Sequence, residues 1–212
     1  MVQSWNSESL KCLKYVIKNK SLIVPHLRVV DIRDINYQQL KSMGFKGVLM
    51  DKDNTITQPF MPTIYEPYKD SIKECKRIFG DDNVAIISNS AGSSDDKNFI
   101  LANAMEKSLG IHILKHNTKK PDGIQSVIDY FKAPPKDIVM IGDRFLTDIL
   151  FGNLYGMFTI FTEPITSKGD NFVVKLIRNK EKEFVFNLID KNGLKPPKHE
   201  RYTEGTIKDR LK

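Results

Sequence analysis

Cysteine, long apolar runs and excess acidic charge are all scarce in this chain, and each scarcity excludes a class of protein. The two cysteines, Cys12 and Cys75, are too few for a disulfide framework, and no CxxC pair is present. No stretch approaches the roughly 18 consecutive apolar residues of a membrane-spanning helix, and no secretory h-region is present. We therefore expect reduced thiols in an intracellular compartment.

The charge balance favours anionic partners. The 212 residues carry a formal net charge of +7, which suits phosphorylated metabolites, nucleic acid or an anionic bilayer without choosing among them. The N-terminal region has several Lys and Ser residues and few acids, as organelle-targeting peptides do, but its first arginine is Arg28. The targeting pattern is therefore incomplete.

Apolar segments that alternate with helical segments predict the fold class. The predicted strands are nearly all apolar, as strands buried on both faces are. They cover residues 47–51, 83–90, 112–116, 137–143 and 157–162. Such alternation is typical of parallel βαβ units, so we expect an α/β fold, a Rossmann-like parallel sheet with helices on both faces.

A basic amphipathic helix is predicted before this sheet. Within residues 8–20, apolar residues recur at helical spacing with lysines between them. The apolar positions are Leu10, Leu13, Val16 and Ile17. Such a helix can bind an anionic membrane surface or pack on the rest of the protein, and the sequence leaves both alternatives open.

The chain is predicted to have three parts. These are an N-terminal amphipathic and membrane-proximal segment (1–44), an α/β core (45–165) and a C-terminal helix with a polar tail (166–212). The C-terminal helix is expected over residues 171–189. The tail from Lys191 is polar and contains proline, so we expect it to be loosely ordered.

Polar side chains follow the predicted strands where each strand ends. Asp51 and Asp53 come directly after the first strand, although two carboxylates so close together repel each other. The groups that follow the strands, in order, are Asp51, Asp53, Thr55, Ser88, Asn89, Lys119, Lys120, Asp143 and Asp148. Because the carboxyl ends of parallel strands meet at one edge of a sheet, we expect these groups to converge.

This set of groups matches what phosphoryl transfer requires. It offers a nucleophile, a proton donor and acceptor, positive groups for phosphate oxygens, and carboxylates for a metal. Hard oxygen ligands favour Mg²⁺ over zinc. Cysteine-based phosphatase chemistry is excluded, because the residues six positions after the cysteines are Lys18 and Asp81 instead of arginine.

Four short motifs resemble those of the haloacid dehalogenase superfamily of phosphatases. They are DKDNT (51–55), ISN (87–89), KKP (119–121) and GDRFLTD (142–148), in this order and at strand ends. The resemblance covers roughly residues 45–165, and it implies the fold of that superfamily. A DxDxT motif alone occurs by chance, so the order of all four carries the resemblance.

The resemblance implies a role for each residue. Asp51 would attack phosphorus to form an aspartyl-phosphate, and Asp53 would protonate the leaving group and then activate water. The metal would be held by Asp51, the Asp53 backbone carbonyl, Asp143 and Asp148. The substrate-binding residues would be Thr55, Ser88, Asn89, Lys120 and Lys52.

Three of these assignments stay open in the sequence. Ser90 competes with Ser88 for the phosphoryl contact. Lys119 competes with Lys120, although the motif lysine often precedes a proline, which favours Lys120. The division of metal binding between Asp143 and Asp148 varies within the superfamily.

Substrate choice in this superfamily is usually set by an inserted cap. The two usual insertion points, after the first motif and between the second and third, have no room for one here. We therefore expect a capless protein with an open site. An open site favours large substrates such as a protein, a nucleic acid or a lipid headgroup at a bilayer.

Longer stretches resemble the eukaryotic mitochondrial phosphatidylglycerophosphate phosphatases of this superfamily. They are VVDIRDI (29–35), LKSMGFKGVLMDKDNTIT (40–57) and ISNSAGSSDD (87–96). Lys52 and Asn54 belong to that group's pattern. The resemblance implies Mg²⁺-dependent conversion of phosphatidylglycerophosphate to phosphatidylglycerol, for cardiolipin biosynthesis, at the matrix face of the mitochondrial inner membrane.

The expected partner is accordingly a phospholipid in an anionic membrane, with peripheral association through the N-terminal helix and a homo-oligomer left open. Two alternatives remain. One is a phosphatase for nucleic-acid ends or phosphoproteins, and the other is a basic RNA-binding scaffold with a vestigial site. The intact motif residues argue against the scaffold, and the lack of interleaved aromatic and basic residues argues against nucleic acid.

Overall fold

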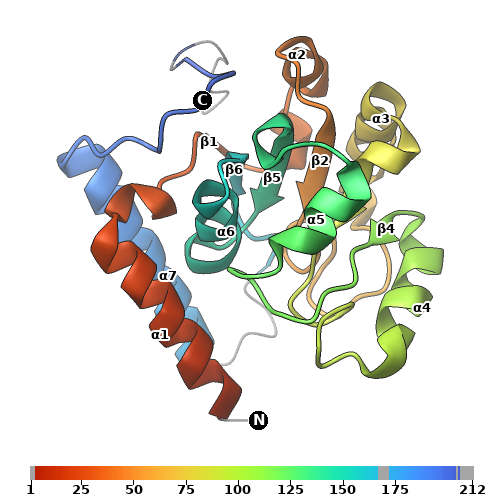
Figure 1. Ribbon diagram of the computed structural model, residues 1–212, viewed down its shortest axis with the longest axis horizontal. Coiled ribbons are helices and arrows are strands. Elements are labelled where there is room, and N and C mark those ends of the chain that lie inside the picture. Colours follow the sequence, from red (N-terminus) through yellow and green to blue (C-terminus); the bar gives the residue numbers. More distant parts are fainter. Residues whose placement is uncertain (1–2, 167–171, 204, 206–212) are drawn as a thin grey trace.

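A six-stranded parallel sheet lies at the centre of the computed structural model, which describes residues 3–166, 172–203 and 205 (Figure 1). The strand order is β1-β6-β5-β2-β3-β4, and every pairing is parallel. The strands are β1 (Leu27–Val29), β2 (Gly47–Met50), β3 (Val84–Ile86), β4 (His112–Ile113), β5 (Ile138–Gly142) and β6 (Phe158–Thr162). The predicted α/β fold is therefore confirmed.

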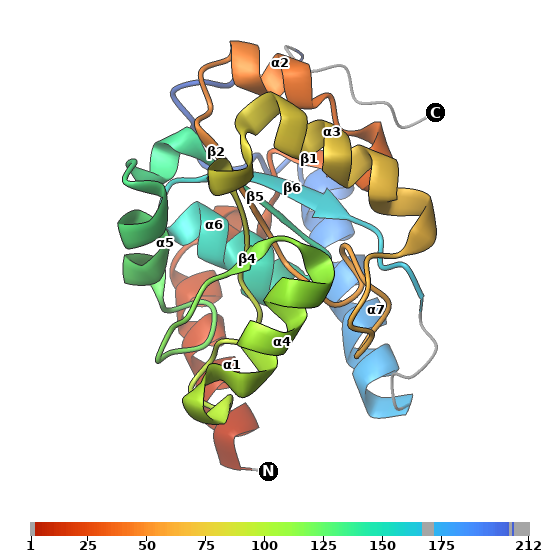
Figure 2. The same ribbon diagram turned by 90° about the vertical axis from the view of Figure 1, so that its right-hand side faces the viewer.

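Helices cover both faces of this sheet (Figure 2). They are α1 (Gln3–Lys18), α2 (Tyr37–Ser42), α3 (Lys69–Phe79), α4 (Ile100–Leu109), α5 (Ile124–Phe131), α6 (Leu150–Leu154) and α7 (Phe172–Phe186). Side chains alternate along a strand, so Val48 and Met50 of β2 pack with α3 and α4, while Leu49 packs with α5 and α6. Burial on both faces explains why the strands are apolar throughout.

The two terminal regions pack together beside the sheet. Cys12 and Val16 of α1 are buried in one cluster with Val185 of α7 and Leu188, and Figure 1 shows α1 in front of α7. The predicted helix is present, and its apolar positions are divided between the protein interior and the surface. Val16 is buried, but Leu13 and Ile17 are 52% and 71% exposed, and the Leu10 side chain lies outside the described residues.

The segment before residue 45 contributes directly to the sheet. β1 pairs with β6 and forms one edge, with Leu27 opposite Ile160. The boundary predicted at residue 45 leaves β1 outside the core, because a strand of three residues gives little periodic signal. Within residues 3–166 and 172–203, no helix has the length and hydropathy needed to cross a bilayer.

The predicted absence of a cap is confirmed. Residues 51–65 form a loop with a single isolated bridge, and residues 90–119 contain α4, β4 and one short 3-10 turn. The carboxyl edge of the sheet is therefore not covered by an inserted domain at either of the two usual positions.

The C-terminal region is anchored at the opposite edge of the sheet. Asp137, just before β5, is buried and forms ion pairs with Arg201 and with Lys46, which precedes β2. Burial alone would raise the pKa of Asp137, but these two partners lower it. The tail, predicted to be loosely ordered from Lys191, is therefore held in place up to residue 203, while residues 204 and 206–212 lie outside the described residues.

Candidate active site

Two neighbouring strands bring the first carboxylates together. Met50 of β2 is paired with Ile141 of β5, so Asp51 and Asp143, which follow these strands, emerge side by side. The third carboxylate, Asp148, lies in the helical turn Phe145–Ile149 and returns toward the strand ends. Gly142 permits this approach, because a Cβ atom there would lie 2.4 Å from Cβ of Asp148.

Asp51, Asp143 and Asp148 form a carboxylate cluster. One oxygen of each lies within 4.8 Å of the others. Burial, together with the neighbouring carboxylates, raises the pKa of Asp51 to about 7 and that of Asp143 to about 6, although Lys120 and Arg178 act in the opposite direction. Crowded, desolvated carboxylates bind protons or a cation, so the cluster fits a hard divalent cation with oxygen ligands.

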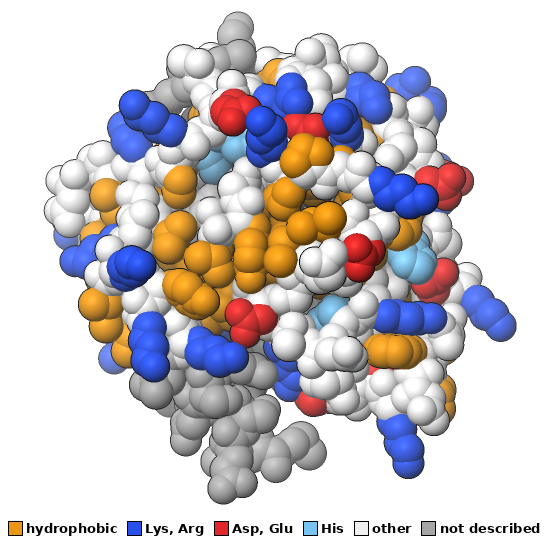
Figure 3. Space-filling view, in the orientation of Figure 1, with side chains coloured by type: hydrophobic (Ala, Val, Ile, Leu, Met, Phe, Trp, Pro, Cys, Tyr) orange, Lys and Arg blue, Asp and Glu red, His pale blue; other side chains and the backbone are white. Residues whose placement is uncertain are grey.

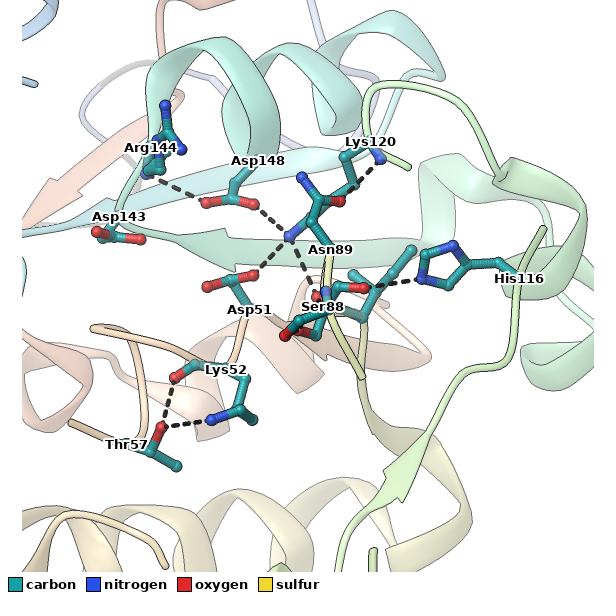
Figure 4. A network of polar contacts seen from close by, with 12 residues as sticks. Asp51, Lys52, Thr57, Ser88, Asn89, His116, Lys120, Asp143, Arg144 and Asp148 are labelled. Atoms are coloured by element: carbon teal, nitrogen blue, oxygen red, sulfur yellow. Dashed lines mark hydrogen bonds and ion pairs between the residues drawn. The ribbon is translucent and has the colours of Figure 1, made fainter. Parts of the chain in front are cut away.

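Lys120 lies at the centre of the site (Figure 4). Its buried Nζ donates hydrogen bonds to Asp51 Oδ1 at 2.6 Å, to Asp148 Oδ1 at 2.5 Å and to the carbonyl of Ile87 at 3.1 Å. Burial alone would lower the pKa of Lys120, but the two carboxylates raise it. The structure therefore places Lys120 against the predicted nucleophile, whereas the competing Lys119 forms an ion pair with Asp95.

The second aspartate of the first motif points to another part of the site. Asp53 lines the cavity described below, and Oδ1 accepts hydrogen bonds from Lys52 Nζ at 2.6 Å and from the Phe60 amide at 2.9 Å. Its carboxylate is not part of the carboxylate cluster, which agrees with a metal contact through its backbone carbonyl only. This leaves the Asp53 carboxylate available for proton transfer.

The structure places Lys52 and Thr55 differently from the predicted substrate contacts. Lys52 is 1% exposed, and its Nζ bonds Asp53, Thr57 Oγ1 and the carbonyl of Met61 beneath the loop. Thr55 is also buried, and its hydroxyl has no hydrogen-bond partner among the described residues. Neither residue lines the cavity, so Lys52 is placed to orient Asp53.

The second motif forms the opposite wall of the site. Ser88, Asn89 and Ser90 all line the cavity, and the hydroxyls of the two serines are 3.0 Å apart. The Asn89 side chain accepts a hydrogen bond from the Lys120 amide at 2.9 Å. His116 Nε2 lies 2.9 Å from the Ser88 carbonyl, so a histidine fixes this turn from behind.

Sequence reasoning missed two charged residues of the cavity wall, Arg144 and Arg178. Arg178 of α7 donates to Asp143 Oδ2 at 2.5 Å and lines the cavity. It belongs to the region that the sequence analysis placed outside the core. No motif surrounds Arg178, so only the packing of α7 beside the sheet could reveal its place.

These residues line one open cavity of about 590 Å³ at the carboxyl edge of the sheet. It contains a carboxylate nucleophile candidate, a separate carboxylate for proton transfer, hydroxyls and several cationic groups. The cationic side chains at its walls are Lys119, Lys120, Arg144 and Arg178. This combination suits an anionic substrate that reacts at phosphorus.

Comparisons with known proteins agree with this chemistry. Residues 7–166 match the family model described as mitochondrial PGP phosphatase. The chain is 40% identical over 186 residues to phosphatidylglycerophosphate phosphatase 1, chloroplastic/mitochondrial, of Arabidopsis thaliana, covering 87% of this chain and 53% of that protein. It is 34% identical over 151 residues to phosphatidylglycerophosphatase GEP4, mitochondrial, of Saccharomyces cerevisiae, covering 69% of this chain and 80% of that protein. The chain thus spans about half the length of the Arabidopsis relative.

Proposed function

Because this chain belongs to the mitochondrial PGP phosphatase family, we propose that it hydrolyses the phosphomonoester of phosphatidylglycerophosphate to phosphatidylglycerol and inorganic phosphate. One observation carries the proposal. Asp51, Lys120 and the remaining carboxylates of the cluster converge at the wall of an open cavity, with Asp53 beside them. The relatives named for this reaction cover most of the chain.

In the first half of the reaction, a carboxylate oxygen of Asp51 attacks phosphorus. A bond forms between this oxygen and phosphorus, and the bond from phosphorus to the lipid glycerol oxygen breaks. The glycerol oxygen takes its proton from the Asp53 carboxyl group, and phosphatidylglycerol leaves. Asp53 suits this role because its carboxylate faces the cavity and lies outside the carboxylate cluster.

In the second half, a water molecule attacks the phosphorus of the aspartyl-phosphate. The Asp53 carboxylate takes a proton from this water, and the bond to the Asp51 oxygen breaks. Inorganic phosphate leaves and both aspartates return to their starting states. Lys120 and the Ser88 hydroxyl would contact the phosphoryl oxygens through both halves, a role that their positions at the cavity wall support.

We propose Mg²⁺ as the cation of the carboxylate cluster. Asp51, Asp143 and Asp148 would hold it through their side chains, and Asp53 through its backbone carbonyl. Bound there, it would neutralise charge on the phosphate oxygens and on the crowded carboxylates. The all-oxygen donor set supports Mg²⁺ over softer metals.

The cellular setting follows from the substrate. Relatives are named as mitochondrial, and we propose that this protein acts in mitochondria, at the matrix face of the inner membrane, on the route to cardiolipin. Peripheral attachment through α1 is supported by the exposure of Leu13 and Ile17 beside the exposed Lys14 and Lys18. The uncapped cavity supports a substrate that remains in a bilayer.

The test is phosphate release from phosphatidylglycerophosphate in liposomes, with Mg²⁺ and with EDTA, alongside p-nitrophenyl phosphate. Asp51→Asn should remove activity on both substrates, and Asp129→Asn, an exposed carboxylate on α5, serves as the matched control. Turnover of the aryl phosphate alone would keep the mechanism and exclude the lipid. Inactivity of the folded protein on both substrates would instead favour a binding role.

A further inference from the structure

The loop of residues 58–62, called the rim loop here, presents bare apolar side chains beside the active site. Phe60 is 83% exposed and Met61 is 46% exposed, and Phe60 also lines the cavity. No charged residue occurs between Asp53 and Glu66, although 28% of the chain is charged. An exposed phenylalanine at the mouth of a cavity lined by charged side chains requires an explanation.

The rim loop is held in this conformation by the catalytic motif. Lys52 Nζ donates to the Met61 carbonyl at 3.2 Å, and the Phe60 amide donates to Asp53 Oδ1 at 2.9 Å. Pro59 and Pro62 stiffen the loop on either side. Phe60 has a φ of 64°, in the left-handed region that residues with a side chain seldom adopt. The backbone at Phe60 is therefore held in an uncommon conformation while its side chain remains exposed to solvent.

The thickness of the headgroup region limits how far a lipid phosphate can extend from a bilayer into the cavity. The headgroup region on each side of a bilayer is only about 5–7 Å deep. A phosphate at the end of a short lipid headgroup therefore reaches a recessed nucleophile only if the cavity mouth touches the membrane. This argument rests on the proposed lipid substrate.

We propose that the rim loop inserts Phe60 and Met61 into the interface of an anionic phospholipid bilayer while the lipid phosphate occupies the cavity. Aromatic side chains favour this interface. The net charge of +7 matches anionic lipid, and Lys119 and Arg144 at the cavity walls can contact lipid phosphates. The insertion places the membrane against the carboxyl edge of the sheet, with Asp53 bonded directly to the inserted loop.

Tryptophan fluorescence tests the insertion directly. The sequence has one tryptophan, Trp5, so a Trp5→Phe background allows Phe60→Trp to report alone. Phe184→Trp, at a 47% exposed position of α7, is the matched control. With vesicles of phosphatidylcholine and phosphatidylglycerol, we expect blue-shifted emission and quenching by brominated lipid for Phe60→Trp only. Unchanged Phe60→Trp emission with vesicles would overturn the proposal.

Vesicle co-sedimentation measures the contribution of the rim loop to binding. Phe60→Ser should weaken partitioning about tenfold, because removing a buried aromatic side chain loses at least about 1.4 kcal/mol of transfer free energy. Phe184→Ser should bind as the unaltered chain does. If Ile17→Ser of α1 abolishes binding and Phe60→Ser does not, then α1 is the anchor and the rim loop is not.

The same vesicles separate this proposal from the proposed function. Hydrolysis of phosphatidylglycerophosphate without quenching of Phe60→Trp would leave the enzyme assignment intact and remove the rim loop from the interface. Quenching without hydrolysis would support the rim loop and count against the lipid phosphatase. A protein partner instead of a membrane would leave Phe60→Trp emission unaffected by vesicles, and so would contradict the proposal.

Discussion

At the residue scale, Lys120 serves as an internal counter-ion for two carboxylates. Its single ammonium group bridges Asp51 and Asp148 and is 1% exposed. Removing one partner from a buried charged network is costly because the remaining charges stay desolvated. Lys119, one residue earlier, instead pairs with an Asp95 side chain that is 63% exposed.

This contrast gives a matched pair of substitutions. Lys120→Met should destabilise the metal-free protein by about 3–5 kcal/mol and abolish phosphatase activity, since both the charge balance and a phosphate contact are lost. Lys119→Met should cost less than about 1 kcal/mol. Urea unfolding in EDTA measures both. Equal, small losses would show that Lys120 is not the central cation.

The raised pKa of Asp51 makes a prediction about pH. Its pKa is near 3.8 in an unfolded chain and about 7 in the metal-free fold, so the protonated carboxyl favours folding at low pH. This contribution is fully present below about pH 4 and is lost as pH rises through 7. Asp51→Asn lacks it, so in EDTA the variant should gain on the unaltered chain between pH 5 and 8, by on the order of 1–3 kcal/mol.

Comparing Asp51→Asn with the unaltered chain cancels the contributions of other titrating groups to the free energy of unfolding. Burial lowers the pKa values of His26, His116 and His199, which favours folding as pH rises through their unfolded value, but these histidines are common to both chains. The measurement is the free energy of unfolding of each protein at several pH values. Parallel profiles would mean that Asp51 is ionised throughout the range. Saturating Mg²⁺ should reduce the gain of the variant, since the cation binds the ionised cluster.

Residues directly after strands, and Lys120 in its motif, could be placed from the sequence, whereas side chains of the loop after β2 could not. Asp51 and Asp143 follow directly from the pairing of two apolar strands. Lys52 could not be placed, because its direction depends on the turn in which Asn54 adopts a φ of 66°. A one-residue step after a strand decides whether a side chain faces the cavity or the loop.

At the element scale, α7 completes the active site from outside the predicted core. Arg178 neutralises Asp143, while Glu181, one turn later, is partly buried and accepts a hydrogen bond from the Leu146 amide at 2.7 Å. The packing of α7 on α1 and on Phe161 of β6 keeps this face of the helix at the site. The sequence of α7 mixes polar and apolar residues without a motif, so it did not indicate that the helix contributes Arg178 to the active site.

Arg178 and a bound cation compete for Asp143, which predicts a specific metal response. Arg178→Met should destabilise the protein by about 2 kcal/mol in EDTA, because Asp143 loses its partner. Saturating Mg²⁺ should then stabilise the variant more than it stabilises the unaltered chain. Lys182→Met, one turn later and paired with the half-exposed Glu163, is the control and should change little. An identical Mg²⁺ response in Arg178→Met and the unaltered chain would contradict the competition.

The start of α4 depends on loop geometry that the local sequence pattern does not predict. The sequence pattern of residues 95–109 is that of a helix, but α4 begins only at Ile100, because Asn98 and Phe99 have positive φ values. The Asp96 carboxylate instead accepts hydrogen bonds from the amides of Leu101 and Ala102, in the first turn of α4. The apolar pattern predicted the helix, but not the loop geometry before it.

At the scale of the whole molecule, the predicted core of residues 45–165 lacks parts of its own packing. β1 forms a sheet edge, and the cluster around Phe145, Leu150 and Phe161 is completed by α1 and α7. We expect a chain of residues 45–165 to unfold without cooperativity and to bind a hydrophobic dye, unlike the full chain. Cooperative unfolding of the short chain would support the predicted boundaries.

Lysine and arginine side chains are widespread on the surface, as the net positive charge predicts (Figure 3). On the face shown in Figure 3, lysine and arginine side chains are spread around hydrophobic side chains that gather over α6 and toward α5. The sequence predicted the sign of this charge from composition alone. It could not predict that the exposed Phe60 stands at the mouth of the cavity, because that depends on the loop conformation.

The anchoring of Arg201 on Asp137 has a practical consequence for single-molecule work. It fixes the neighbouring Glu200, whose side chain is 71% exposed, at the amino edge of the sheet, away from the catalytic edge. Both native cysteines are buried, so Glu200→Cys would provide one readily accessible thiol for a tether. A molecule attached to a surface at this point would present its catalytic edge outward, which allows the force needed to pull it from a supported bilayer to be measured.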